Sequence, residues 1–376
     1  MPSVKSVLVR ATLLLFAVDS AAQQPLSVYP PGLLVDRAPN ELRPYVLPKN
    51  SGQPIRTLND ISRLAVTGNS SAGSFTVMQV ASLQQDAPSV APHLHKRHYE
   101  NFYCNKGRVQ LWSQLNGTDN VKQTRILQPG DFGAVAHNHI HAFHMLEPDT
   151  VFTVVIQPGG FEQFLIDIAD DMYESEIGSA FRPIKESPRP FPALDVAIQD
   201  RYDSWPIGGH VLRDDAVDGI AGFGNWHNGS NELATDSKTA FYIAKNWGPK
   251  YLNSEGGAYK IIAPLTTAAT SAGNLTMGSI TMSPLLTNLT ASEVTLPDHT
   301  TMLAEEGRLV IRIQNETAVL ADGDIVFIPG GTTFSYWALA AATKFMYIGA
   351  GPDGLASRLI ENSIPWEFAS YPQYSP

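Results

Sequence analysis

The stretch HLHKRHYENFYCNKG, residues 93–107, contains three histidines, one glutamate and one glycine, and no histidine precedes it in the chain. An extended strand would turn His93 and His95 to one face, because side chains alternate between the two faces of a strand. Glu100 follows after KRHY, which is long enough for the chain to turn and return a carboxylate to the same centre. Imidazoles and a carboxylate that converge are typical of a transition-metal site. A solvated strand edge would be the simpler interpretation.

A second histidine cluster follows in the same part of the chain. Seven of the ten histidines lie between positions 93 and 144, and four of them form the stretch HNHIHAFH that ends there. His137, His139 and His141 have the same parity as Phe143, so a strand would turn all four side chains to one face. One of these histidines is expected to complete the metal site.

Three other side chains near these clusters receive simpler interpretations. His98 and His144 fall on other faces, where we expect them to contact solvent or to orient the ligating imidazoles. Cys104 shares the face of Glu100, and as a small buried apolar residue it requires no chemical role.

Composition narrows the range of functions. The 376 residues are 43% hydrophobic and 16% charged, which suits a globular protein with room for two domains. The net charge of −10 disfavours binding to nucleic acid or to an anionic membrane surface. After the N-terminus, no segment has the roughly 20 apolar residues that a membrane span requires. We therefore expect a small-molecule partner.

The N-terminus predicts secretion. Lys5 and Arg10 precede the apolar run ATLLLFAV and small residues up to Ala22, so residues 1–22 are interpreted as a signal peptide. The chain has only one cysteine, which excludes an internal disulfide. Six N-x-S/T triplets agree with a secreted glycoprotein and begin at Asn69, Asn116, Asn228, Asn274, Asn288 and Asn315.

An internal repeat predicts the domain organisation. SAGSFT at 71–76 recurs as SAGNLT at 271–276, an offset of 200 residues, and both halves alternate in the manner of strands. Helical periodicity is mainly confined to FEQFLIDIADDMY, and the proline-rich stretch RPIKESPRPFPALD indicates an extended connector. The prediction is an all-β protein with a first barrel at 23–170, a linker with short helices at 171–232 and a second barrel at 233–376.

The first histidine cluster resembles the first cupin motif, H-x-H-x(4)-E-x(6)-G, which His93, His95, Glu100 and Gly107 match without a gap. The second cupin motif aligns with the segment that ends at His141, which the resemblance therefore implies as the fourth ligand. His139 remains its rival. The resemblance implies two β-jelly-roll barrels, a bicupin.

The second half lacks the ligands. The offset of 200 brings Glu293, Thr295 and Thr300 opposite the first two histidines and the glutamate, and Phe334 stands where His141 does. His299 is nearby but alone. The second barrel is therefore predicted to be metal-free and structural.

One complete and one degenerate site make the chain similar to the secreted fungal-type quercetin 2,3-dioxygenases, as do VTG at 66–68 and QPGGFE at 157–162. This resemblance implies copper, although the ligand types also suit manganese, iron or nickel. It implies that flavonols react with O2 to give a depside and carbon monoxide, with Glu100 as ligand and general base. It also makes a homodimer an open expectation.

The substrate pocket should be apolar, because flavonols are flat and aromatic. Phe102 and Phe143 lie two residues beyond the ligands Glu100 and His141, so they should point into the barrel together with Met78. The resemblance implies that these side chains contact the substrate. Ordinary packing of a barrel interior would also account for them. The chain departs from the family at Ser62 and its neighbours, where aromatic residues are expected, which leaves a related flavonol or another enolizable aromatic open. Two different functions also stay open: an oxalate oxidase or decarboxylase, and a non-catalytic metal-binding bicupin.

Overall fold

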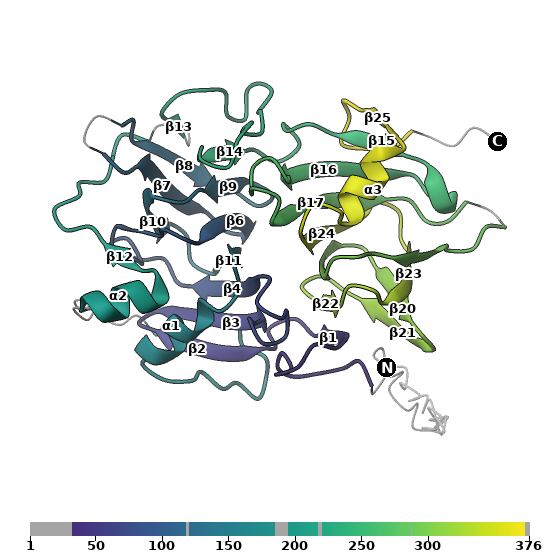
Figure 1. The fold of residues 1–376 in the computed structure, drawn as a ribbon, viewed down its shortest axis with the longest axis horizontal. Helices are drawn as coiled ribbons and strands as arrows, with labels where there is room; N and C mark the ends of the chain where they lie inside the picture. Colours follow the sequence, from purple (N-terminus) through teal and green to yellow (C-terminus); the bar gives the residue numbers. More distant parts are fainter. Residues whose placement is uncertain (1–31, 118–119, 185–194, 217–219, 287, 373–376) are drawn as a thin grey trace, which may run out of the picture.

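The structure is a computed structural model that describes residues 32–117, 120–184, 195–216, 220–286 and 288–372. The predicted signal peptide, residues 1–22, lies outside the described residues. Two β-barrels stand side by side, one from each half of the chain, and each is built from two antiparallel sheets (Figure 1). The predicted all-β bicupin architecture is confirmed.

The N-terminal barrel consists of a seven-stranded and a six-stranded sheet. In order across the first sheet, the strands are β14 (Phe241–Ile243), β9 (Phe132–Val135), β6 (Tyr99–Lys106), β11 (Thr150–Gln157), β4 (Thr76–Ser82), β3 (Asp60–Val66) and β2 (Gln53–Thr57). Across the second sheet they are β12 (Trp205–Pro206), β5 (His93–Leu94), β10 (His139–Met145), β7 (Val109–Leu115), β8 (Gln123–Leu127) and β13 (Ile220–Ala221).

The C-terminal barrel consists of an eight-stranded and a four-stranded sheet. The first sheet contains β1 (Tyr45–Leu47), β22 (Ile325–Ile328), β19 (Thr300–Glu306), β24 (Thr343–Ala350), β17 (Leu275–Met282), β16 (Lys260–Thr266), β15 (Tyr251–Asn253) and β25 (Ser363–Pro365). The second contains β18 (Glu293–Thr295), β23 (Thr333–Ala338), β20 (Leu309–Ile313) and β21 (Glu316–Leu320).

Helices are few and short among the described residues. The predicted helical stretch forms α1 (Glu162–Ile168), which covers one end of the N-terminal barrel (Figure 1). In the predicted linker, α2 (Val196–Tyr202) begins at Asp195, whose side chain accepts a hydrogen bond from the backbone N–H of Ile198 at 2.8 Å. The remaining helices are α3 (Leu355–Glu361) and the 3₁₀ turn η1 (Glu255–Gly257).

The barrels exchange a strand. β1 precedes the N-terminal barrel in the chain but pairs with β22 of the C-terminal barrel. In return, β14 from the C-terminal half of the chain pairs with β9 of the N-terminal barrel. Each exchanged strand is followed by a backbone N–H that donates a hydrogen bond to an aspartate of the receiving barrel. Lys49, after β1, donates to Asp324 at 2.9 Å, and Lys245, after β14, donates to Asp131 at 2.8 Å. The linker also contributes β12 and β13 to the N-terminal barrel. The predicted division into a first barrel at 23–170, a linker at 171–232 and a second barrel at 233–376 does not account for the strands that pair outside their own part of the chain.

Three apolar clusters stabilise the fold: one inside each barrel and one between them. Strand β4 shows why its sequence is apolar on both faces. Met78 and Val80 lie in the interior of the N-terminal barrel, while Val77 belongs to the cluster between the barrels. A strand that is covered on both faces reads as a continuous apolar run.

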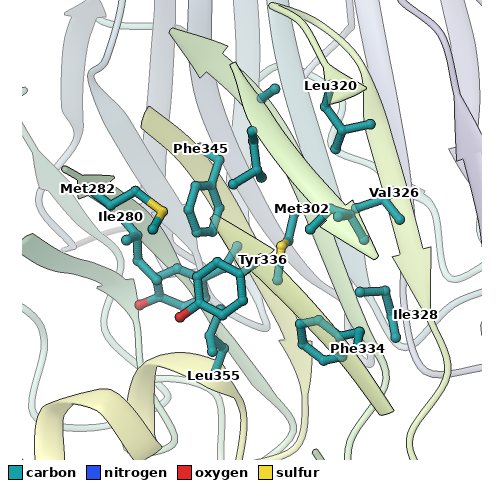
Figure 2. Packing of buried hydrophobic residues seen from close by; sticks show 14 of the residues in the cluster. Ile280, Met282, Met302, Leu320, Val326, Ile328, Phe334, Tyr336, Phe345 and Leu355 are labelled. Atoms are coloured by element: carbon teal, nitrogen blue, oxygen red, sulfur yellow. The ribbon is translucent and has the colours of Figure 1, made fainter. Parts of the chain in front are cut away.

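Apolar side chains fill the interior of the C-terminal barrel (Figure 2). Phe334, at the position that corresponds to His141, is only 2% exposed and lies in this core. It pairs with Val294 on β18, whereas Glu293 and Thr295 are exposed. The offset of 200 therefore aligned this strand wrongly by one residue, which turns its side chains to the opposite face.

Candidate metal centre

Three strands of the N-terminal barrel bring the four predicted ligands together. His93 on β5 pairs directly with His141 on β10, and Glu100 lies on β6 of the facing sheet. His95 follows β5 immediately. One nitrogen or carboxylate oxygen from each of these four buried side chains lies within 4.8 Å of the others.

Backbone carbonyls orient the three imidazoles. A carbonyl oxygen only accepts hydrogen bonds, so each Nδ1 carries a proton and each Nε2 is the nitrogen that faces the centre. The Nδ1 donors and their acceptors are His93 to Ala91 at 2.9 Å, His95 to Asp203 at 2.5 Å and His141 to His139 at 3.0 Å.

Glu100 faces these nitrogens. Its Oε2 lies 2.9 Å from Nε2 of His141, and its Oε1 lies 3.4 Å from Nε2 of His95. Nε2 of His95 is buried and has no hydrogen-bond partner among the described residues. A buried imidazole nitrogen without such a partner, directed at a carboxylate, is what a metal ligand requires.

Electrostatics favour a neutral His93 and an ionised Glu100, and they favour a proton on His95. Burial, reinforced by His141 and His95, lowers the pKa of His93 well below its usual value. Burial alone would raise the pKa of Glu100, but the attraction of His95 and the hydrogen bond with His141 hold it well below its usual range. Burial likewise opposes protonation of His95, yet the attraction of Glu100 outweighs it and raises the pKa of His95.

These four side chains fit a divalent transition metal. Three imidazole nitrogens with fixed tautomers and one ionised carboxylate are a ligand set that copper, iron, nickel, zinc and manganese accept. Their hydrogen-bonded Nδ1 atoms orient the rings before any metal binds, which lowers the cost of binding. The residues are therefore a candidate metal centre of the kind that the sequence predicts.

Asp203, which follows α2, holds the loop between the ligands. Its carboxylate accepts hydrogen bonds from the backbone N–H groups of Lys96, Arg97 and His98 at 2.9, 2.6 and 3.0 Å, and from Nδ1 of His98 at 2.9 Å. Its carbonyl accepts the Nδ1 proton of His95. Burial alone would raise the pKa of Asp203, but the hydrogen bonds from His98, Lys96 and Arg97 hold it well below its usual range.

The other histidines lie outside the group of four. His139 is buried, its Nδ1 contacts the carbonyl of His137 at 3.0 Å, and it is absent from the convergent donors. His98 binds Asp203 and therefore supports the ligand loop, and His144 donates from Nε2 to the carbonyl of Gln85 at 2.8 Å.

Cys104 is buried and carries no disulfide. Burial raises the pKa of its thiol, so the group stays protonated at neutral pH.

A cavity of about 380 Å³ opens beside the candidate metal centre. His93 and Glu100 line one part of it, and so do Met78, Phe102 and Phe143, the three side chains that the sequence analysis assigned to substrate contact. The ring centroids of Phe102 and Phe143 are 6.1 Å apart. The cavity is large enough for a flat molecule of two or three rings.

Phe164 of α1 and Phe161, the residue directly before that helix, add two aromatic side chains to the cavity that the sequence did not predict there. Phe161 and Phe164 line the cavity, and the ring of Phe161 packs edge-on against His95 with 5.0 Å between centroids. The helical periodicity of FEQFLIDI predicts a helix, but it does not predict which part of the barrel that helix covers. No lysine or arginine is found among the described residues that line the cavity.

Comparison with known proteins agrees with this geometry. No protein-family model matches the chain. A quercetin 2,3-dioxygenase of Aspergillus japonicus is 37% identical over 347 residues, which cover 90% of this chain and 98% of that protein. The chain belongs to the quercetin 2,3-dioxygenase family. The resemblance inferred from the sequence, and with it the assignment as an enzyme, is confirmed.

More distant similarities follow. A second member of the family, the quercetin 2,3-dioxygenase of Bacillus subtilis, is 32% identical over 139 residues, or 37% of this chain and 38% of that protein. An oxalate decarboxylase structure from Lactobacillus farciminis covers 83% of this chain and 87% of its own, with 12% identity and a TM-score of 0.48. The structure of the Bacillus subtilis oxalate decarboxylase at pH 4.6 covers 82% of this chain and 76% of its own, with 12% identity and a TM-score of 0.46.

Two further features of this family member concern its surface. All six asparagines of the predicted sequons are exposed: Asn69, Asn116, Asn228, Asn274, Asn288 and Asn315. Within the described ranges, every helix is too short or too polar to cross a membrane.

Proposed function

We propose that this protein is a copper-dependent dioxygenase that opens the heterocyclic ring of flavonols such as quercetin with O2, to give a depside and carbon monoxide. The observation that carries the proposal is the convergence of His93, His95, Glu100 and His141 at the wall of an aromatic cavity. The relative from Aspergillus japonicus, whose name states this substrate, supports it over nearly its whole length.

Glu100 is the proposed general base. Its carboxylate is ionised and lines the cavity, so it can take the proton of a flavonol 3-hydroxyl that enters there. Deprotonation makes the ring electron-rich, O2 adds across the carbons that flank C3, and C3 leaves as carbon monoxide. Both atoms of O2 remain in the depside. When bound, the metal supplies a positive charge that favours the anionic oxygen.

The imidazoles and the cavity have separate tasks. His93, His95 and His141 would hold the metal through Nε2, with their Nδ1 protons engaged elsewhere. Phe102 and Phe143 offer faces for a flat aromatic ligand and keep water from the carboxylate. This division explains why an apolar wall stands next to four polar ligands.

Copper is proposed because the fungal-type resemblance implies it, and manganese, iron and nickel are the other ions that this ligand set accepts. Metal analysis of the purified protein decides between them. Reconstitution of the stripped protein with each ion then identifies the one that restores turnover.

An oxalate-converting activity is less well supported. Oxalate is a small dianion that needs cationic side chains around it, and no lysine or arginine is among the described residues that line the cavity. A non-catalytic metal-binding bicupin is the remaining candidate, and absence of turnover with a fully loaded protein would favour it.

The test measures carbon monoxide released per flavonol consumed, with quercetin in air. We expect a ratio near one, loss of turnover when the metal is stripped, and recovery with copper. H141Q should lose metal and activity, whereas H139Q is the matched control on the same strand and should keep its metal. No carbon monoxide from fully loaded protein would overturn the proposal.

Secretion is part of the same proposal. Removal of residues 1–22 and glycans on the exposed sequons are its expected signs. Mass spectrometry of the protein secreted by a eukaryotic host, before and after enzymatic deglycosylation, tests both; an intact N-terminus without glycans would contradict it.

A further inference from the structure

The cavity has a polar end that the proposed chemistry does not use. Asp60 and Ser62 both line it, and both come from β3. They stand two residues apart on one strand, so their side chains share the face that Leu64 turns into the barrel core. Ser62 pairs with Val80 on β4, another lining residue.

This end of the cavity lies at a different position along the sheet from the metal centre. In the sheet, Glu100 pairs with Ile156 on β11, whereas Ser62 lies opposite Val80, which pairs with Phe152 on that same strand. The two groups therefore occupy different levels of the barrel. A molecule that binds at the metal and extends along the cavity points its far end toward Asp60.

The carboxylate of Asp60 is built into the wall. It is only 9% exposed, and its Oδ1 accepts a hydrogen bond from Nε2 of Gln85 at 2.5 Å. A second hydrogen bond comes from Ser82. Burial raises the pKa of Asp60 to about 6, although the two hydrogen bonds act to lower it. At neutral pH the group is therefore largely ionised.

An ionised carboxylate has roughly four acceptor positions. Gln85 and Ser82 are two side chains that hydrogen-bond Asp60, fewer than the acceptor positions of its carboxylate, and the residue also lines the cavity. Leaving a buried charge incompletely hydrogen-bonded costs free energy, and a ligand that donates a hydrogen bond recovers it. Phenolic hydroxyl groups are suitable donors.

We infer that Asp60, together with Ser62, determines substrate specificity by binding a phenolic hydroxyl at the end of the flavonol remote from its 3-hydroxyl. This inference rests on the proposed function. The protein accordingly selects flavonols with a free hydroxyl on the distal part of the ring system over analogues that carry hydrogen or a methyl ether there, because an apolar substituent leaves the buried carboxylate without its donor.

A matched set of substrates tests the inference. 3-Hydroxyflavone has no further hydroxyl. 3,7-Dihydroxyflavone and 3,4′-dihydroxyflavone each carry one additional hydroxyl, at opposite ends of the ring system. The copper-loaded wild type should convert at least one of the dihydroxy compounds with a kcat/KM about 10- to 100-fold above that of 3-hydroxyflavone, the range for a hydrogen bond to a charged group.

D60N keeps the shape of the side chain and removes its charge, and it should reduce this ratio by about tenfold. S62A leaves the carboxylate in place and should reduce the ratio by about two- to tenfold, which keeps the test available if D60N folds poorly. D36N, a change at an exposed aspartate, is the control and should leave the ratio unaltered. A purely structural role of Asp60 would lower all three kcat/KM values together.

Two outcomes overturn the inference: a wild-type ratio near one, or a ratio that D60N and S62A leave unchanged. Failure of the proposed function looks different, because then none of the three compounds releases carbon monoxide. In that case, anaerobic calorimetric titration of the same compounds still measures selectivity at Asp60. Equal affinities for all three compounds in the wild type and D60N would then refute it independently of turnover.

Discussion

Replacing Asp203 by asparagine should weaken metal binding even though this residue is not a ligand. Its carboxylate binds the backbone N–H groups of Lys96, Arg97 and His98, and its carbonyl orients His95. These contacts fix the loop between the second histidine ligand and the glutamate. The perturbation therefore acts on how well the ligands are arranged before the metal arrives.

The magnitude follows from the hydrogen bonds. Each bond to a charged group contributes about 1.5–3 kcal/mol, and D203N converts one acceptor oxygen into an amide that faces N–H donors. Loss of one or two of these bonds should lower the free energy of unfolding of the metal-free protein by about 1.5–6 kcal/mol. Partners that orient metal ligands typically change metal affinity by about 10- to 100-fold, and we expect a loss in that range.

The matched control is D200N on helix α2, which ends directly before Asp203. The side chain of Asp200 is 70% exposed and reaches Arg97 at 3.5 Å, and such surface ion pairs contribute at most about 1 kcal/mol. Both variants are compared by chemical denaturation of the metal-free protein and by copper titration against a competing chelator. If D203N lowers stability as expected but keeps the wild-type copper affinity within about twofold, the positioning argument is wrong.

Three further predictions concern other parts of the molecule. E100Q should keep part of its metal affinity but lose at least about 100-fold in kcat, measured as carbon monoxide release; unchanged turnover would remove Glu100 as the base. F334A should lower the free energy of unfolding by about 3–5 kcal/mol because it empties a buried site of the C-terminal core, while L339A at a 57% exposed position should change it by less than about 0.5 kcal/mol. Burial raises the pKa of Asp60 from 3.8 to about 6, so the folded metal-free protein holds this proton more tightly than the unfolded chain. That contribution is complete below the unfolded pKa and is lost as pH rises through the folded one. Between about pH 4 and pH 7, the free energy of unfolding of the wild type should therefore fall by about 2 kcal/mol relative to that of D60N, measured by denaturation at each pH. A difference between the two proteins that does not vary with pH would contradict the burial of this carboxylate.

The sequence alone determined the local parts of the site. His93, His95 and Glu100 lie within a few residues of one another, and their spacing together with strand alternation predicts which side chains share a face. The same parity assigned Phe102 and Phe143 to the cavity, which they line with Met78. The internal repeat predicted two barrels, because equal spacing between repeated turns reflects one fold used twice.

Only the tertiary structure decided the contacts between distant segments. Asp203 binds Lys96, which is 107 residues away in sequence, and Asp60 meets the cavity from a strand that carries no ligand. Neither aspartate differs locally from an ordinary surface carboxylate, so no pattern marks it. Likewise, a repeat offset cannot detect a shift of one residue, as at Val294, or a strand that crosses to the other barrel. Local spacing reports which way a side chain points, but the packing of sheets decides what it meets.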